Sequence, residues 1–356
     1  MRCSPRGHSA GRSSCLRHLA SGLVWLGLAT LAHPAAVRAE SGRITIIEEN
    51  DALQSKETDR HYTQGALLSY LSPTLTADSF AARLYAPLSS VGIMQPGPDT
   101  QRKFDVVFGQ SIFTPSNIKI AVPDPRDRPY AGWLYGGGSL LQETHGTMLE
   151  NFEILAGVVG PASLAKEAQE AVHDALGLKN SNLDAAWSHQ LKNEPGVMIT
   201  YDRHWKVWQN SLFGVQTEFI PEAGLTAGNV MTYADAGAVF RIGQNLGADY
   251  GVARVRPSVS GTSWFNASRM TSPWGWYLFG GVQGRAVAQN IFLDGNTFQN
   301  SPSVDKKILV ADFSVGASVF YMDWAKLDFT FTERTKEFKT QQSMDRFGAA
   351  SLSVRF

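Results

Sequence analysis

The first residues of this chain that could do chemistry are Glu49-Asn50-Asp51, which close an extended segment. An amide and a carboxylate stand side by side there, and a polar segment containing Thr63 opens the next extended segment. Such hard oxygen donors suit a divalent cation or a polar catalytic site. The alternative is a turn-forming Asx pair, which is common where strands end. The motif alone leaves both interpretations open.

A second polar group lies on the one segment with helical periodicity, residues 161–177. Ser163 suits the N-cap of this helix and Gly177 suits its end. At 100° per residue, an apolar stripe of Leu164, Ala168, Ala171 and Ala175 stands opposite a polar stripe of Lys166, Gln169, Glu170 and His173. His173 is therefore expected to face water or a polar cavity. In a polar cavity, a histidine suits general-base work near neutral pH.

The other histidines that follow the first 39 residues are weaker candidates. His61 lies among charged neighbours, His145 in an expected tight turn, His189 in a polar loop and His204 on an expected strand. We expect all four to be structural or solvated.

The elements that must position these groups are extended segments with period-two alternation. Near the C-terminus, Phe313 and Val315 alternate with Asp312 and Ser314, and the chain ends on a strand that closes with Phe356. Long strands with one apolar and one polar face are typical of a transmembrane β-barrel with a polar lumen. A soluble β-sandwich alternates as well, but strands near ten residues long and aromatic residues near strand ends favour the barrel. These aromatic residues are Trp133, Tyr135, Trp205, Trp208, Trp274, Trp276, Tyr277 and Trp324.

The sequence therefore predicts an all-β fold, a transmembrane antiparallel barrel of about 12 strands with one short helix in an extracellular loop. The long connections near 73–102, 114–130, 160–195 and 245–272 are expected on the outer side, where function tends to lie. The strands are predicted at 43–50, 63–72, 103–113, 131–143, 148–159, 196–207, 211–221, 231–244, 274–287, 307–322, 325–337 and 346–356.

The first 39 residues have the features of a secretory signal peptide. A basic segment without acidic residues precedes an apolar run at 19–32, and small residues favour cleavage between Ala39 and Glu40. The alternative, an uncleaved anchor, is disfavoured because the apolar run is shorter than the roughly 20 residues that span a bilayer. Residues 40–356 then form one barrel domain in the outer membrane.

Removing the signal peptide changes both the cysteine content and the charge. Cys3 and Cys15 both lie in residues 1–39, so the mature chain has no disulfide and requires another source of stability, such as a closed hydrogen-bond network. The chain has 32 basic and 32 acidic residues; residues 1–39 contain five arginines and no acids, leaving 27 basic against 32 acidic residues. This acidic balance argues against nucleic acid as a partner.

Taken together, these segments resemble the outer-membrane lipid A 3′-O-deacylase family across essentially the whole mature chain. The order and spacing of the motifs are more specific than any single one. The motifs are Asn50-Asp51, Asp59-Arg60, Tyr62-Thr63-Gln64-Gly65, Gln110-Ser111-Ile112-Phe113-Thr114-Pro115, Asp127-Arg128-Pro129-Tyr130-Ala131-Gly132-Trp133, Gly157-Val158-Val159-Gly160-Pro161 and a helix with Gln169 and His173.

The resemblance implies an enzyme that removes the 3′-linked acyloxyacyl chain of lipid A by calcium-dependent ester hydrolysis. Lipid A or lipopolysaccharide would be the substrate, outer-membrane lipids the surroundings, and the enzyme a monomer. His173, with Gln169 one turn before it, would be the base that activates water. Asn50, Asp51 and Thr63 would form the Ca²⁺ and carbonyl site.

Two further implications concern charged residues. Lys119 would support the substrate, with Ile118 or Arg126 as alternatives for that position. After the helix, Leu178-Lys179-Asn180 contains no acidic residue where the family pattern has one, so one calcium ligand is missing from the expected place.

Two other functions remain open. A phospholipase A-type barrel would hydrolyse glycerophospholipids with the same calcium and histidine chemistry, and a porin or structural barrel would have no chemistry. The sequence has no serine in a Gly-x-Ser-x-Gly setting, which agrees with direct attack by water rather than a covalent acyl-enzyme.

Overall fold

The structure, a computed structural model, describes residues 40–51, 60–176, 182–255 and 262–356. The predicted signal peptide at 1–39 lies outside the described residues and stays a prediction. Asp59, Gly177, residues 178–180 and the side chain of Ala175 also lie outside them.

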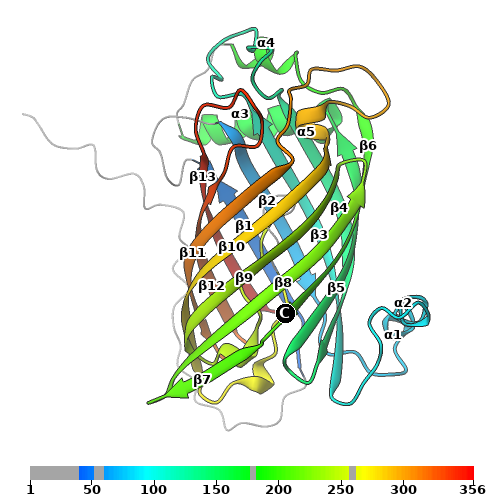
Figure 1. The fold of residues 1–356 in the computed structure, drawn as a ribbon, viewed down its shortest axis with the longest axis vertical. Coiled ribbons are helices and arrows are strands. Elements are labelled where there is room, and N and C mark those ends of the chain that lie inside the picture. Colours follow the sequence, from blue (N-terminus) through cyan, green and yellow to red (C-terminus); the bar gives the residue numbers. More distant parts are fainter. Residues whose placement is uncertain (1–39, 52–59, 177–181, 256–261) are drawn as a thin grey trace, which may run out of the picture. The chain divides into compact units, whose positions relative to one another are not determined.

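Twelve antiparallel strands close into a barrel (Figure 1). The wall closes through β1 against β13 and through β6 against β8. The prediction of an all-β antiparallel barrel of about 12 strands is confirmed. The strands of the wall are β1 Arg43–Asn50, β2 His61–Leu71, β3 Thr100–Thr114, β4 Ala131–Thr144, β5 Met148–Val159, β6 Glu194–Trp205, β8 Val215–Gly228, β9 Met231–Gln244, β10 Trp274–Asn290, β11 Leu309–Tyr321, β12 Ala325–Arg334 and β13 Asp345–Arg355.

One further strand, β7 (Trp208–Leu212), pairs only with β8. The strand predicted at 211–221 corresponds to β8, but its predicted start is wrong, because the chain reverses at Phe213 and Gly214. Phe213 and Gly214 both have positive φ, 51° and 80°, which matches the two-residue turn of a tight hairpin.

Period-two alternation places apolar side chains on the outer wall and polar side chains in the lumen. In β11, Phe313 and Val315 are exposed on the outer wall, whereas Asp312 is buried inside. The Asp312 carboxylate accepts hydrogen bonds from Arg285 (2.9 Å) and Arg334 (2.7 Å). Charges in the lumen are thus paired, which avoids the large penalty of an uncompensated buried charge.

The aromatic residues divide between the outer wall and the lumen, which corrects the prediction that all of them meet lipid headgroups. Trp208, Trp274 and Trp324 are exposed. Trp133 and Tyr135 are buried and stack on each other at 4.1 Å between ring centroids. Tyr277 is also buried. The strand parity of each residue, rather than its distance from a strand end, decides which side it faces.

The two ends of the barrel carry different connections. Arg43 pairs in register with Arg355, so β1 begins and β13 ends at the same end, here called the terminal end; the opposite end is the distal end. Because consecutive strands are antiparallel, the β2–β3 and β9–β10 connections lie at the terminal end, and the β1–β2, β3–β4 and β5–β6 connections at the distal end. The prediction that loops 73–102 and 245–272 share one side with 114–130 and 160–195 is therefore wrong. Loop length does not reveal the side; strand direction does.

The β9–β10 connection folds into the lumen. Arg254 donates to Glu49 of β1 (2.7 Å), and Ser263 donates to Asp105 of β3 (2.5 Å). Two cavities beside this segment have volumes of only about 40 Å³ each, which is enough for very few water molecules. The segment occupies the space that an open channel would need.

We therefore expect no porin-like conductance from the purified protein. When the protein is inserted into a planar lipid bilayer at roughly 0.1–1 M salt, where surface charges are screened, the current should stay at the baseline. A general porin gives stepwise increases under the same conditions. Stepwise currents of porin size from a folded sample would show that the β9–β10 segment leaves the lumen.

Helices are short and lie mostly in the connections. The prediction of a single helix is corrected, because α3 (Ala165–Leu176) is accompanied by shorter ones in the described residues. In the portion of the chain that the structure describes, no helix has the length and apolar character needed to cross a membrane. The shorter helices are α1 Phe80–Arg83, α2 Ala86–Ser90, α4 Leu183–Trp187 and α5 Ile291–Asp294.

Candidate functional site

Asn50 and Asp51 lie at the distal end, where β1 ends. Asn50 pairs in register with Gln64 of β2, so it stays within the sheet. Asp51 follows directly and is buried, and its Oδ2 accepts a hydrogen bond from the backbone N–H of Arg60 (2.6 Å). The carboxylate therefore bridges the end of one strand and the start of the next.

A β-bulge places Thr63 beside them. The pairing of β2 with β3 shifts register between Tyr62 and Gln64, which leaves Thr63 as the extra residue. Bulges of this kind redirect side chains next to functional sites. The Thr63 hydroxyl lies 2.8 Å from that of Thr114, which has the same strand parity as the exposed Phe108. Thr63 is therefore on the outer side of the wall.

Helix α3 begins close against β4. A 3₁₀ turn, Pro161–Ser163, precedes it, and Leu164 adopts a left-handed conformation with φ 58°. The predicted N-cap at Ser163 is thus wrong, because Leu164 stands between it and the helix. A Cβ atom built on Gly132 would lie 2.2 Å from both Ser163 Oγ and Ala165 Cβ, so only glycine allows this approach.

The buried face of α3 carries two polar side chains. Ala165, Gln169 and His173, spaced by four residues, are buried, and His173 is only 7% exposed. In the predicted apolar stripe, Leu164 and Ala171 are exposed. In the predicted polar stripe, Lys166 and Glu170 are half-buried, so neither stripe is the buried face as a whole. Of the two alternatives for His173, exposure to water is excluded by this burial, and a polar cavity beside it stays a prediction.

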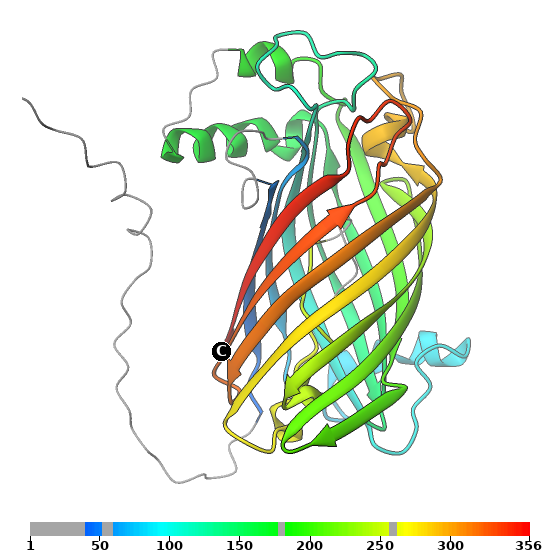
Figure 2. The same cartoon turned by 60° about the vertical axis from the view of Figure 1, so that its left-hand side comes forward.

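Side chains of α3 and α4 hold this orientation. The Trp187 Nε1–H donates to Gln169 Oε1 (2.8 Å), which fixes the amide one turn before His173. Ile112 has the parity of a lipid-facing residue, yet it is buried in a cluster with helix residues. The helices therefore cover the outer side of the wall at the distal end, as the two views in Figures 1 and 2 agree. The cluster consists of Ile112, Tyr130, Ala165, Leu183, Ala186 and Trp187.

Lys119 lies apart from this enclosed group. Its side chain is exposed, and its backbone carbonyl accepts a hydrogen bond from Asn182 Nδ2 (2.7 Å). The β3–β4 loop thus contacts the β5–β6 connection near the start of α4. Arg126, the alternative in the same loop, is also exposed and pairs with Asp124 at 2.8 Å.

Sequence reasoning missed Glu48. In β1, Ile46 is exposed on the outer wall, and Glu48 and Asn50 have the same parity. Glu48 Oε1 accepts a hydrogen bond from Gln64 Nε2 (2.8 Å). A carboxylate on the lipid-facing side is costly and indicates function. The signal was visible, since Glu48 interrupts an apolar series that begins with Ile44 and Ile46.

The side-chain oxygens near the ends of β1 and β2 are the candidate ligands for a cation. The carboxylates of Asp51 and Glu48, the amide of Asn50 and the hydroxyl of Thr63 are the hard donors that Ca²⁺ prefers, and Ca²⁺ takes six to eight of them. Within residues 40–51, 60–176, 182–255 and 262–356, no group of three His, Cys, Asp or Glu side chains is placed to hold a metal. The donor types are those that calcium takes, and a calcium ion here would need neutral oxygens to complete its shell.

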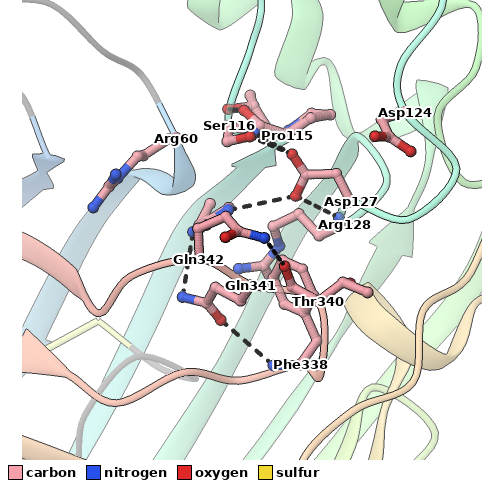
Figure 3. Close-up of polar contacts among 12 residues, drawn as sticks. Arg60, Pro115, Ser116, Asp124, Asp127, Arg128, Phe338, Thr340, Gln341 and Gln342 are labelled. Atoms are coloured by element: carbon pink, nitrogen blue, oxygen red, sulfur yellow. Dashed lines mark hydrogen bonds and ion pairs between the residues drawn. The ribbon is translucent and has the colours of Figure 1, made fainter.

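A second polar group lies on the inner side of the same strand ends (Figure 3). His61 Nδ1 lies 2.6 Å from Asp345 Oδ1, and its Nε2 lies 3.4 Å from Asp127 Oδ1. Gln341 Nε2 donates to Asp345 Oδ2 (3.0 Å). His61, expected to be structural or solvated, is buried and joins the β3–β4 loop to the start of β13.

Asp127 also joins two parts of the β3–β4 loop, in which it lies. Its Oδ2 accepts hydrogen bonds from the backbone N–H (2.8 Å) and hydroxyl (2.5 Å) of Ser116. Burial raises the pKa of Asp127, but the hydrogen bonds from His61 and Ser116 outweigh it and hold that pKa well below its usual range. The carboxylate therefore stays ionised and keeps the loop closed at neutral and mildly acidic pH.

The remaining histidines match their expected roles. His204 is buried between Asp202 (3.0 Å) and Glu222 (3.1 Å), whereas His145 and His189 are exposed.

Comparison with known proteins gives one family and several barrels. The family described as outer membrane protein LpxR matches residues 23–356. Among solved structures, the chain is similar to LpxR from Salmonella typhimurium, with 21% sequence identity and a TM-score of 0.69, covering 88% of this chain and 100% of that one. At this identity the structural likeness shows the fold alone.

Two further structures are more remotely similar. The β domain of the Bordetella autotransporter BrkA has 7% identity and a TM-score of 0.44, covering 90% of this chain and 100% of that one. The translocator domain of the autotransporter NalP from Neisseria meningitidis has 7% identity and a TM-score of 0.37, covering 89% of each chain. No curated protein matches the sequence.

Proposed function

The chain belongs to the LpxR family of outer membrane proteins, and we propose that it is a calcium-dependent esterase that removes the 3′-linked acyloxyacyl chain of lipid A. The observation that carries this proposal is the buried His173. It lies on the same stripe of α3 as Ala165, which packs with Ile112 on the outer side of the barrel wall at the distal end. A site on that side is open to membrane lipids rather than to the lumen. Lipid A or lipopolysaccharide is the proposed substrate, and a monomer is the proposed active form.

Two side chains of α3 have separate roles in the proposed ester hydrolysis. His173 accepts a proton from a water molecule as that water attacks the ester carbonyl, and returns the proton to the leaving alkoxide. Gln169, held by Trp187, packs one turn before His173 and fixes the helix face that carries the imidazole. Helices α3 and α4 exclude bulk water from this space, which strengthens the electrostatic interactions inside it.

Residues from the strand ends would hold the cation and orient the ester. Asn50, Asp51 and Thr63 are the proposed Ca²⁺ ligands, and Glu48 is the acidic side chain nearest to them on the same face of β1. When bound, the ion would polarise the ester carbonyl as a Lewis acid. Glu48 offers a replacement for the acidic residue that is missing after α3 in the sequence.

Lys119 would bind the anionic headgroup of the substrate. Its ammonium is exposed on a loop that the contact between Asp127 and Ser116 keeps closed. A phospholipase A-type activity is the second candidate, since glycerophospholipids also present an ester near an anionic headgroup. A passive porin is disfavoured by the occupied lumen.

Mass spectrometry of lipid A tests the proposal. Expression in a bacterial host that lacks this activity should convert lipid A to a species lighter by one 3′ acyloxyacyl group, with phospholipids unchanged. If the folded protein leaves lipid A intact and releases lysophospholipids instead, the phospholipase alternative is correct. If neither lipid changes in the presence of calcium, the protein is not an esterase for membrane lipids.

A further inference from the structure

A polar cavity of about 230 Å³ opens at the distal end, on the inner side of the strand ends (Figure 3). Three segments that are remote in sequence form it: the start of β2, the β3–β4 loop and the β12–β13 loop. Most of the lining has no role in the proposed hydrolysis. The exceptions are Ser116 and Asp127, which hold the loop of Lys119, Arg60, whose backbone N–H binds Asp51, and the alternative Arg126. The cavity is lined by Arg60, His61, Ser116, Asp124, Arg126, Asp127, Phe338, Thr340, Gln341, Gln342 and Ser343.

The cavity walls are rigid where the buried residues meet. His61 is fixed between Asp127 and Asp345, and its ring packs edge-on against Phe338 at 5.3 Å between centroids. The backbone N–H of Glu337 and of Phe338 both donate to Gln341 Oε1, the former at 2.6 Å. A preformed site of this kind loses little entropy when it binds a ligand.

The open side of the cavity presents donors and acceptors in balance. Arg60 and Arg126 supply positive charge, while Asp124 supplies negative charge at the cavity edge. Gln342 and Ser343 are exposed and offer an amide and a hydroxyl. A bare anion requires an excess of positive charge, whereas a sugar ring presents hydroxyl groups that both donate and accept. The lining therefore suits a saccharide better than an isolated phosphate.

The cavity and the ester site lie on opposite sides of the same strand ends. Asp345 has the parity of Phe347, which packs against Tyr62 inside the barrel, so His61 also points inward. The positive φ of His61, 61°, lets His61 and Tyr62 both face inward before the bulge turns Thr63 outward.

Arg60 connects the cavity to the ester site. The backbone N–H of Arg60, which lines the cavity, donates to Asp51 of the proposed calcium site (2.6 Å). A lipid with a saccharide headgroup is wide enough to lie over the strand ends, with its acyl chain outside the wall and a sugar inside the mouth.

We propose that this cavity is a saccharide subsite, which holds one sugar of the substrate headgroup while the ester bond lies on the outer side of the β1 and β2 ends. The subsite rests on the proposed function and adds the feature that separates lipid A from a glycerophospholipid. A glycerophospholipid has no sugar to fill the cavity, so it forgoes this part of the binding energy.

The test uses the full protein in detergent and the phosphorylated disaccharide of lipid A stripped of all acyl chains. Isothermal titration should detect its binding to the wild type, and Gln342→Ala and Ser343→Trp should each weaken it at least tenfold. The first substitution removes an amide, and the second fills the cavity. Gln299→Ala removes an exposed glutamine at the same end but outside the cavity, and should leave binding unchanged.

The outcomes separate this inference from the proposed function. If the wild type deacylates lipid A but does not bind the disaccharide, or if the cavity variants bind it normally, the subsite is wrong and the function stands. If inorganic phosphate at equal concentration displaces the disaccharide, the cavity binds phosphate and the saccharide assignment is wrong. Failure to deacylate lipid A contradicts the proposed function, whatever the disaccharide does.

Discussion

Replacing His173 by alanine is expected to lower the rate of lipid A deacylation by a factor of about 10²–10⁴, the usual contribution of a positioned general base. The imidazole lies on the face of α3 that is buried against the barrel, where no other histidine of the β5–β6 connection is enclosed in the described residues. Alanine is a good helix former, so α3 should persist and the barrel should fold normally. Mass spectrometry of lipid A, together with circular dichroism of the purified variant, measures both effects.

His189→Ala is the matched control for this variant. His189 belongs to the same connection but is exposed beyond the end of α4, so its loss should leave the rate unchanged. Full activity of His173→Ala would show that the base lies elsewhere. Equal losses in both variants would point to the fold of the connection rather than to a base.

The barrel could be predicted from sequence because the alternation of residue types along a strand indicates which side of the strand faces lipid and which faces the lumen. Most residues of β11 show by their type whether they face lipid or lumen, although the apolar Val310 and Phe320 are buried in core clusters. The hairpin at Phe213 was missed because its two turn residues differ in type, and only Gly214 is a usual carrier of positive φ. The β9–β10 segment was assigned to the wrong end because its length was taken as the sign of the outer side, whereas the direction of the strands decides the end.

The site could be predicted only in part, for a related reason. Asn50, Asp51 and Thr63 are close in sequence and belong to one strand pair, so local reasoning could group them, and their role in a metal site stays a prediction. The covered face of α3 depends on Gly132 and Ile112, which lie on other strands and are not identifiable as partners from the helix sequence. Helical periodicity separates two faces but does not say which one is covered.

The role of His61 has the same origin. Its partners Asp127 and Asp345 are distant in sequence, and only the closed barrel brings them together. The charged residues next to His61 in sequence therefore did not indicate its partners in the fold. What distinguishes it is the pair of carboxylates that the fold supplies.

Asp51→Asn should raise the calcium concentration needed for half-maximal deacylation by about 10–100-fold, because ligand charge sets the affinity of calcium sites. Asparagine keeps the shape of the side chain and an oxygen that can accept the Arg60 N–H, so the strand ends should remain joined. A change in calcium dependence without a change in fold would then report the lost charge alone. Titration of calcium into chelator-treated protein, followed by activity and by calorimetry, gives two independent measurements.

Glu333→Gln provides the comparison for Asp51→Asn. Glu333 also lies at the distal end, on β12, but it pairs with Arg346 (2.7 Å) on a part of the wall away from α3. Its neutralisation should leave the calcium dependence unchanged, whereas a general effect of acidic charge at this end would shift both variants equally. Retained turnover of the wild type in excess EGTA would contradict calcium dependence itself. In that case Asn50, Asp51 and Thr63 would act on the ester directly, and Asp51→Asn would change the rate without changing its response to calcium.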